Sequence, residues 1–213
     1  MKKFVLLLIV TIVFMPQLGK ASDLPLKNLA LDKPYKVITA WPDDYLRQLE
    51  ETYEDTGSKE LTDGDFGSTN YTDSAWRSFL RQGGRTIIVD LGEVKTINEI
   101  TGHFLQFWDV GIFVPRFIDY YLSLDNESFA YMGQVETSVG PWNLNNQKEQ
   151  FTLKGLNHQA RYVKIQFPAD VNVFMDELEV FGIDGVLPAS HKLQITEERD
   201  QEKLWEKSAI LGP

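Results

Sequence analysis

Tryptophans recur in segments whose composition is typical of loops. Trp41 precedes Pro42, Trp108 precedes Asp109, and Trp142 lies between a proline and an asparagine. An indole ring stacks on the CH-rich face of a sugar, and planar polar groups reach the sugar's hydroxyls. The candidate ligand contacts on this basis are Trp41, Arg77, Gln106, Trp108, Trp142 and Asn143. For each tryptophan, packing onto its own loop is the alternative.

No sequence pattern favours catalysis. Gly-x-Ser-x-Gly, His-Glu-x-x-His and a Gly-rich phosphate loop are missing, and the histidines, His103, His158 and His191, are widely separated. The sequence has no cysteine, which excludes disulfides, thiolate nucleophiles and cysteine-ligated zinc. A glycosidase needs two facing carboxyl groups; carboxylates are abundant here, but the sequence alone does not show any two of them facing each other. We therefore expect a protein that is not an enzyme.

The composition is that of a folded, acidic and exported protein. The 213 residues are 43% hydrophobic and 12% aromatic, which excludes a disordered chain. A net charge of -10 argues against nucleic acid and anionic lipid as partners. Lys2-Lys3, the apolar run Phe4–Phe14 and Gly19-Lys20-Ala21 are typical of a cleaved signal peptide. We expect a secreted, extracellular protein with no membrane insertion after cleavage; an uncleaved anchor is the alternative.

Short segments rich in β-branched and aromatic residues alternate with turn-forming residues along the mature chain. They predict strands at Tyr35–Ala40, Arg85–Leu91, Thr96–Phe104, Phe113–Leu124, Ala130–Val135, Gln150–Leu153, Arg161–Phe167 and Glu177–Phe181. Asp125-Asn126 predicts a hairpin turn, because Asx residues tolerate the backbone angles that such a turn needs. Strands without alternating helices indicate an all-β fold, an antiparallel β-sandwich or jelly roll.

Two stretches depart from the strand pattern. Asp43–Tyr53 places Tyr45 and Leu49 at helical spacing, which predicts a short helix in an early loop. From Gly185 the composition turns polar, and Glu197–Lys203 is a run of charges with little to bury. The chain is therefore divided into a signal peptide (1–21), one sandwich domain (22–183) and a polar tail (184–213). The tail is a linker or the start of a further domain.

Several short pieces occur in an order and at a spacing that resemble a known family. They are Asn28–Pro34, Leu61–Gly64, Tyr71–Trp76, Ile88–Gly92, Tyr121–Asn126, Arg161–Ile165 and Glu177–Gly182. Over about Asn28–Gly182 the chain resembles the discoidin family, the coagulation-factor C-type domain. It looks similar in particular to modules of secreted bacterial glycosidases and cell-surface proteins. The resemblance implies a galactose-binding-like jelly roll that binds ligands with the loops at one end. The segment Trp41–Tyr53 departs from the family as a long insertion.

The resemblance also implies a structural calcium site. The family's Asp-Gly corner corresponds to Asp63-Gly64, and the glutamate of its penultimate strand corresponds to Glu177. Calcium takes roughly six to eight oxygens and mixes carboxylates with backbone carbonyls. Asp65 and Ser68 lie in the same loop and are the candidates to complete the ligand shell. The alternative is an ordinary Asp-Gly turn with a solvated glutamate.

Together these features predict a secreted, non-catalytic carbohydrate-binding module with structural Ca²⁺, whose partner is a carbohydrate or a cell-surface glycan. Two alternatives stay open. The first is a protein- or surface-interaction (adhesion) module with a protein partner, which loops without convergent aromatic and polar groups would favour. The second is the leading segment of a longer secreted glycoside-active enzyme, with catalysis in a domain after Pro213.

Overall fold

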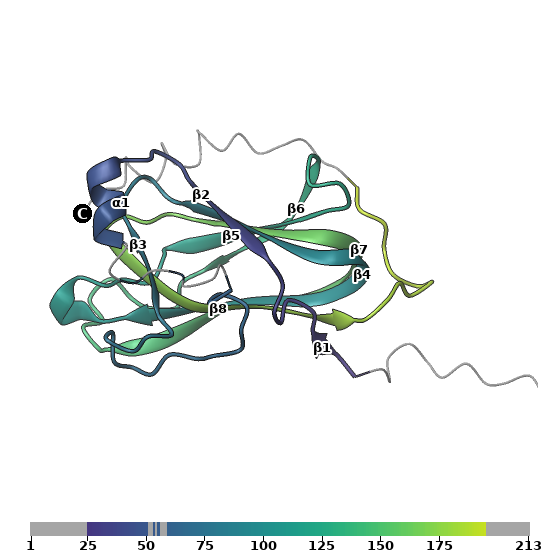
Figure 1. Cartoon of the computed structure of the whole chain (residues 1–213). Helices are drawn as coiled ribbons and strands as arrows, with labels where there is room; N and C mark the ends of the chain where they lie inside the picture. The colour runs from purple at the N-terminus through teal and green to yellow at the C-terminus, as the bar shows by residue number, and fades with distance from the viewer. Residues whose placement is uncertain (1–24, 51–52, 54, 56–58, 195–213) are drawn as a thin grey trace, which may run out of the picture.

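Antiparallel strands form the body of the fold in the computed structural model, which describes residues 25–50, 53, 55 and 59–194. The predicted signal peptide and the charge run Glu197–Lys203 lie outside the described residues. Within the described part of the chain, the elements are β1 (Lys27–Asn28), β2 (Tyr35–Thr39), α1 (Asp44–Glu50), β3 (Arg77–Leu80), β4 (Arg85–Gln106), the 3-10 helix η3 (Trp108–Val110), β5 (Phe117–Ser123), β6 (Phe129–Glu136), β7 (Gln147–Phe167) and β8 (Asn172–Ile183) (Figure 1). No helix among these residues is both long enough and apolar enough to cross a membrane.

Two long strands connect the layers of the fold. β4 pairs with β7 along most of its length, and the register shifts between Asp90 and Lys95. Before the shift β4 also pairs with β2, and after it β4 pairs with β8. Figure 1 shows β4 and β7 curving round at the end opposite α1. Each of the two strands therefore contributes one part to each layer.

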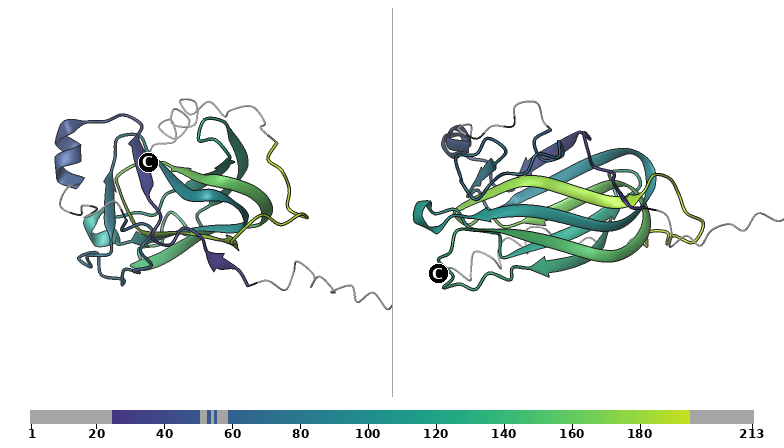
Figure 2. Two further views of the ribbon diagram at one scale, coloured as in Figure 1. Left: turned by 45° about the vertical axis from the view of Figure 1, so that its right-hand side comes forward. Right: turned by 90° about the horizontal axis from the view of Figure 1, so that it is seen from below.

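The strand pairs form a two-layered sandwich. One layer contains β2, the start of β4, the end of β7, β5 and β6, and the other contains β8 with the remaining parts of β4 and β7. β1 and β3 pair with β8 along its other edge. This arrangement confirms the predicted all-β antiparallel β-sandwich, consistent with a galactose-binding-like jelly roll, with a short helix in an early loop (Figure 2).

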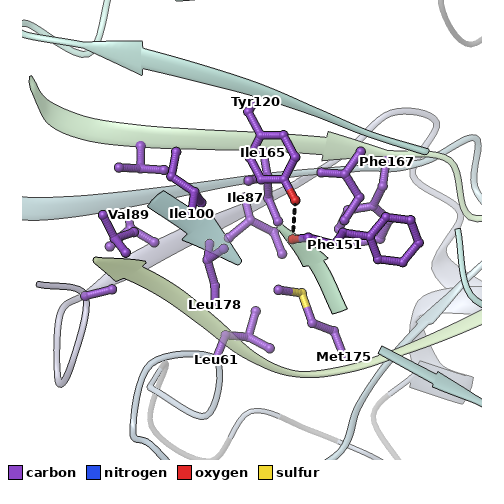
Figure 3. Packing of buried hydrophobic residues seen from close by; sticks show 14 of the residues in the cluster. Leu61, Ile87, Val89, Ile100, Tyr120, Phe151, Ile165, Phe167, Met175 and Leu178 are labelled. Carbon is purple, nitrogen blue, oxygen red and sulfur yellow. Dashed lines mark hydrogen bonds between the residues drawn. The ribbon is translucent and has the colours of Figure 1, made fainter. Parts of the chain in front are cut away.

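The apolar core lies between the two layers. The ring of Phe104 on β4 lies 5.3 Å from that of Phe151 and 5.4 Å from that of Phe167, both edge-on. The hydroxyl of Tyr120, on the other layer, donates to the carbonyl of Phe151 at 2.7 Å (Figure 3). A smaller cluster of Trp76, Leu105, Ile112 and Phe174 lies apart from this core. Ile112, in the segment after β4, therefore packs against side chains of β4 and β8 outside the main core.

The curvature of β4 and β7 decides where the loops meet. Because both strands fold back, their two ends return to the same end of the sandwich. Arg85 pairs with Phe167 at one end of the β4–β7 ladder and Gln106 with Gln147 at the other, and the rings of Phe104 and Phe167 lie 5.4 Å apart. The loops at residues 81–84, 107–116, 137–146 and 168–171 therefore converge there. α1 lies at the same end (Figure 1). Its C-terminal Glu50 forms a largely buried ion pair with Arg85, although no residue of the helix is itself buried.

Candidate functional site

The converging loops enclose a pocket of about 390 Å³. Its walls come from the end of β4, the 107–116 loop, the β6–β7 loop and the β7–β8 loop. The lining residues that concern recognition are Gln106, Trp108, Arg116, Asn143 and Asp170. Valines, prolines and Phe113 make up most of the remaining wall. The pocket therefore presents a mainly apolar surface with a few polar groups.

Trp108 is held at the pocket wall by its own backbone and by a neighbouring ring. Its backbone N–H donates to Oδ1 of Asn146 at 3.0 Å. Its ring meets that of Phe113 edge-on, with 5.3 Å between the ring centroids. The turn closes at Gly111, whose N–H donates to the carbonyl of Trp108 at 3.0 Å. The side chain of Trp108 is 37% exposed. A partly exposed indole fixed in this way can stack on a ligand without first being ordered.

Two of the predicted contacts shape the β6–β7 loop. The buried Gln106 donates from Nε2 to the carbonyls of Asn143 at 2.8 Å and Asn145 at 3.1 Å. Oδ1 of Asn143 accepts from the N–H of Asn145, and its Nδ2 donates to Gln147. Both side chains line the pocket while their polar atoms hold the loop. We therefore assign Gln106 mainly to holding the β6–β7 loop in position.

An ion pair supplies the charged groups of the pocket. Nε of Arg116 lies 3.0 Å from Oδ2 of Asp170, which joins the 107–116 loop to the β7–β8 loop. The side chains are 35% and 52% exposed. Such a pair offers both donors and an acceptor to a hydroxylated ligand. Neither residue was among the sequence candidates, because nothing in the sequence showed that these two loops meet.

Trp142 lies beside the pocket but does not line it. Pro141 and Asn143, its chain neighbours, are both lining residues. The side chain of Trp142 is 88% exposed, the highest fraction among the large hydrophobic residues described. Its position extends the apolar surface beyond the pocket mouth. An exposed indole here is free to contact a part of a ligand that projects from the pocket.

Trp41 and Arg77 lie away from the pocket. Trp41 donates its N–H to the carbonyl of Gln82 at 3.0 Å, and its ring packs against Gly83 in the β3–β4 turn. Arg77 forms an ion pair with Asp55 and donates to the hydroxyl of Tyr35 at 3.0 Å. Neither residue lines the pocket. Contacts within the protein therefore account for the positions of both side chains without a ligand.

A second group of polar residues lies where the 63–68 loop meets β8. A β-bulge in β8 places Asp176 and Glu177 together opposite the single residue His103 of β4. Oε2 of Glu177 accepts from the N–H of Gly64 at 3.2 Å, and Oδ2 of Asp176 accepts from that of Gly67 at 2.9 Å. Both carboxylates therefore face the same loop, and both are fully buried.

Burial leaves these two carboxylates incompletely satisfied. Oδ1 of Asp176 and Oε1 of Glu177 are buried without a hydrogen-bond partner among the described residues. Burial raises the pKa of Asp176 to about 7, and burial together with the nearby carboxylate of Asp63 raises the pKa of Glu177 to about 8. The charged forms are therefore disfavoured unless a cation lies close by.

The other predicted metal ligands lie in the same loop but at its surface. Oδ1 of Asp63 accepts from the N–H of Asp65 at 2.8 Å, and both residues are exposed. The carbonyl of Ser68 accepts from Nε1 of Trp76 at 3.0 Å. Among the described residues, no group of three or more His, Cys, Asp or Glu side chains is placed to hold a metal ion. Calcium held here would need backbone carbonyls as well as carboxylates.

The buried side chain of Trp76 packs against the 63–68 loop. It is 1% exposed, and its ring lies so close to Gly67 that a β-carbon at that position would be 2.4 Å from it. Only glycine allows the backbone to approach the indole so closely. Nζ of Lys148 donates to the carbonyl of Gly67 at 2.7 Å and brings a positive charge near Asp176. Neither Asp176 nor Lys148 was predicted from the sequence. Two adjacent acids in an otherwise apolar strand, Asp176 and Glu177, were the available signal for Asp176.

Several solved structures are similar to this chain at low identity. A fucose binding module of Streptococcus pneumoniae is 16% identical, with 74% of this chain and 96% of that chain covered and a TM-score of 0.47. The lectin domain of Lectinolysin, complexed with Lewis B antigen, is 14% identical, with 74% and 97% covered and a TM-score of 0.49. A mutant chitosan-binding module of a Paenibacillus sp. IK-5 chitosanase/glucanase is 19% identical, with 73% and 98% covered and a TM-score of 0.44.

A sequence search of curated proteins gave no match to this chain. The F5/8 type C domain family model matches residues 47–178, which is more than half of the chain and includes most of the strands. This match confirms the resemblance on which the sequence prediction rested. The chain belongs to the F5/8 type C (discoidin) domain family.

Proposed function

We propose that the chain is an exported, non-catalytic carbohydrate-binding module whose ligand occupies the pocket at the loop end. The observation that carries this proposal is the pocket itself, with a mainly apolar wall, the fixed indole of Trp108 and the Arg116–Asp170 pair. Sugars combine an apolar CH face with ring hydroxyls, so they match both kinds of surface. The chain also belongs to a family that binds ligands with the loops at one end of the domain. This membership supports the pocket as the ligand site.

The proposed contacts divide by chemistry. Trp108 stacks on the sugar ring, Trp142 contacts a unit that projects from the pocket, and Arg116 with Asp170 hydrogen-bonds to hydroxyls. Stacking contributes roughly 25 cal/mol for each Å² of apolar surface buried. Each wet polar contact adds about 1 kcal/mol at most. Binding of a single sugar should therefore be weak and should depend on ring geometry.

The proposal assigns no catalysis to this pocket. Within the described part of the chain, Asp170 is the one carboxylate that lines the pocket, and it is paired with Arg116. Glycoside hydrolysis needs a second carboxyl facing the first. No histidine lines the pocket among the residues that the structure describes. Binding without turnover is therefore the activity that these residues support.

A structural calcium ion is part of the proposal. The orphaned oxygens of Asp176 and Glu177, in a loop rich in carbonyl groups, fit a cation that prefers oxygen ligands. We assign Glu177 and Asp63 as carboxylate ligands and add Asp176 to the set, with Asp65 and Ser68 able to contribute carbonyl or side-chain oxygens. Calcium would supply the positive charge that these buried carboxylates lack.

A protein-interaction role is the second candidate. α1 presents Tyr45 and Leu49 on its exposed surface, 70% and 46% accessible, at the same end of the sandwich as the pocket. An exposed aromatic and aliphatic pair on an inserted helix is an apolar surface that a protein partner could cover. This surface lies outside the pocket lining. The two roles are therefore separable by mutation.

A glycan array tests the main proposal. The exported chain, purified with calcium present, is expected to bind a restricted set of glycans that share one sugar. An array that shows no binding above that of a Trp108→Ala, Trp142→Ala double variant would contradict it. Because Tyr45→Ala with Leu49→Ala alters only α1, that variant should bind the same glycans as the natural sequence. Loss of glycan binding in the α1 variant would place the sugar contacts on α1 and would contradict the assignment of the pocket.

A further inference from the structure

Two histidines far apart in the sequence lie side by side at the edge of the sandwich. The segment after β8 returns to β7, where His158 and His191 form an isolated parallel bridge. The N–H of Gln159 donates to the carbonyl of His191 at 2.9 Å, and the N–H of His191 donates to that of Asn157 at 2.8 Å. Gln159 also donates from its side chain to Oγ of Ser190 at 2.9 Å. The backbone positions of both histidines are therefore fixed by hydrogen bonds.

The two imidazole rings are close and tilted. Their centroids lie 5.3 Å apart with an interplanar angle of 46°. Nδ1 of His158 is buried and has no hydrogen-bond partner among the described residues. Imidazole nitrogens that are shielded from water normally have such a partner. The pair therefore contains an unsatisfied nitrogen next to a second potential ligand.

The spacing of the rings suits a shared metal ion. Zinc–nitrogen distances are about 2.0–2.1 Å, so two imidazoles bound tetrahedrally to one ion have centroids roughly 5 Å apart. Imidazole is a preferred ligand of Zn²⁺, Cu²⁺ and Ni²⁺, whereas Ca²⁺ and Mg²⁺ prefer oxygen. We propose that His158 and His191 together bind a divalent transition metal ion, with one nitrogen from each ring.

The proposed site is independent of the calcium loop and of the sugar pocket. No third His, Cys, Asp or Glu side chain joins the pair within the described residues, so water on the side of the exposed His191 would complete the coordination. Affinity should therefore be moderate and binding reversible. The metal would join the segment around Ser190 to β7 and fix where the chain leaves the sandwich. The bound metal would hold the segment at Ser190 and His191 against β7.

The composition of the chain makes this site easy to test. The sequence has three histidines and no cysteine, so each potential imidazole ligand can be removed in turn. We would titrate Ni²⁺, Cu²⁺ and Zn²⁺ into the exported chain without a histidine tag by calorimetry. Millimolar calcium would be present throughout so that the carboxylates near Glu177 are not available. One ion per chain is expected, and the affinity should fall at least tenfold in His158→Ala and in His191→Ala.

His103→Gln is the matched control. His103 is buried and lies 2.8 Å from Glu179, so it should not contribute to metal binding. Because His191 is exposed, His191→Ala tests the site even if His158→Ala fails to fold. Hydrogen exchange of the Gln159 and His191 amides should slow when the metal is added. Undiminished binding in His191→Ala, no binding in the natural sequence, or loss of binding in His103→Gln would overturn the proposal.

Discussion

Calcium is expected to raise the melting temperature of this domain by several degrees, and substitutions at Glu177 and Asp63 should abolish the rise. A ligand that binds only the folded state adds stability of about 2.7 kcal/mol at a hundredfold excess over Kd. In a domain of this size, each kcal/mol shifts the melting temperature by roughly 2–4 °C. Differential scanning calorimetry in chelator and in millimolar calcium measures the shift.

Glu177→Gln provides the sharpest form of the test. The amide can still accept from the N–H of Gly64 but carries no charge. Without calcium at pH 8 the variant should melt higher than the natural sequence, because it avoids a buried and unsatisfied carboxylate. With calcium the order should reverse. Identical melting curves of the natural sequence in chelator and in calcium would contradict the proposed calcium site.

The same carboxylates set a pH dependence. Burial raises the pKa of Glu177 from its ordinary 4.5 to about 8, so the folded state keeps a proton that the unfolded state has already lost. Stability without calcium should therefore fall as the pH rises through this range. Because calcium binds the ionised carboxylate, its stabilising effect should grow over the same range. A calcium effect that is equal at pH 5 and pH 8 would contradict this assignment.

Among the tryptophans that the structure describes, Trp76→Ala should be the most damaging substitution for stability. The ring is 1% exposed and packs against Gly67, and its Nε1 holds the carbonyl of Ser68. Truncating a buried tryptophan costs roughly 3–5 kcal/mol. Loss of this support should also weaken calcium binding, because the 63–68 loop would no longer be held in place. Thermal melting with and without calcium measures both effects.

Trp142→Ala is the matched control for Trp76→Ala. Its side chain is 88% exposed, so truncation removes little packing and should change the melting temperature by no more than about 2 °C. Calcium should stabilise this variant as it stabilises the natural sequence. Equal stability losses in the two variants would show that the burial described for Trp76 does not contribute to the fold.

Local sequence patterns predicted most strands but not how they continue. The segments Arg85–Leu91 and Thr96–Phe104 are both parts of β4, because the register shift near Asp90 bends the strand without ending it. β1 and β3 were missed, since two and four residues are too few to show a period. The helix prediction succeeded because Tyr45 and Leu49 mark one face, and the helix that the structure describes is Asp44–Glu50.

The candidate site was only partly predictable for a different reason. Gln106, Trp108 and Asn143 were chosen separately, and the structure brings all three to one pocket. Arg77 was chosen as a polar ligand contact, and the structure places it on β3 in an ion pair with Asp55. Whether a polar side chain meets a ligand or a buried partner depends on contacts between distant segments. Periodicity and composition contain no information about such contacts.

The most direct test of the account is a sugar titration of Trp108→Ala beside Trp41→Ala, using the glycan that the natural sequence binds. Trp108 lines the pocket and Trp41 does not, while both are partly exposed, at 37% and 49%. Trp108→Ala should weaken binding at least tenfold and lower the melting temperature by only a few degrees. Trp41→Ala should bind like the natural sequence. Unchanged binding in Trp108→Ala, with binding lost in Trp41→Ala, would contradict the assignment of the pocket as the carbohydrate site.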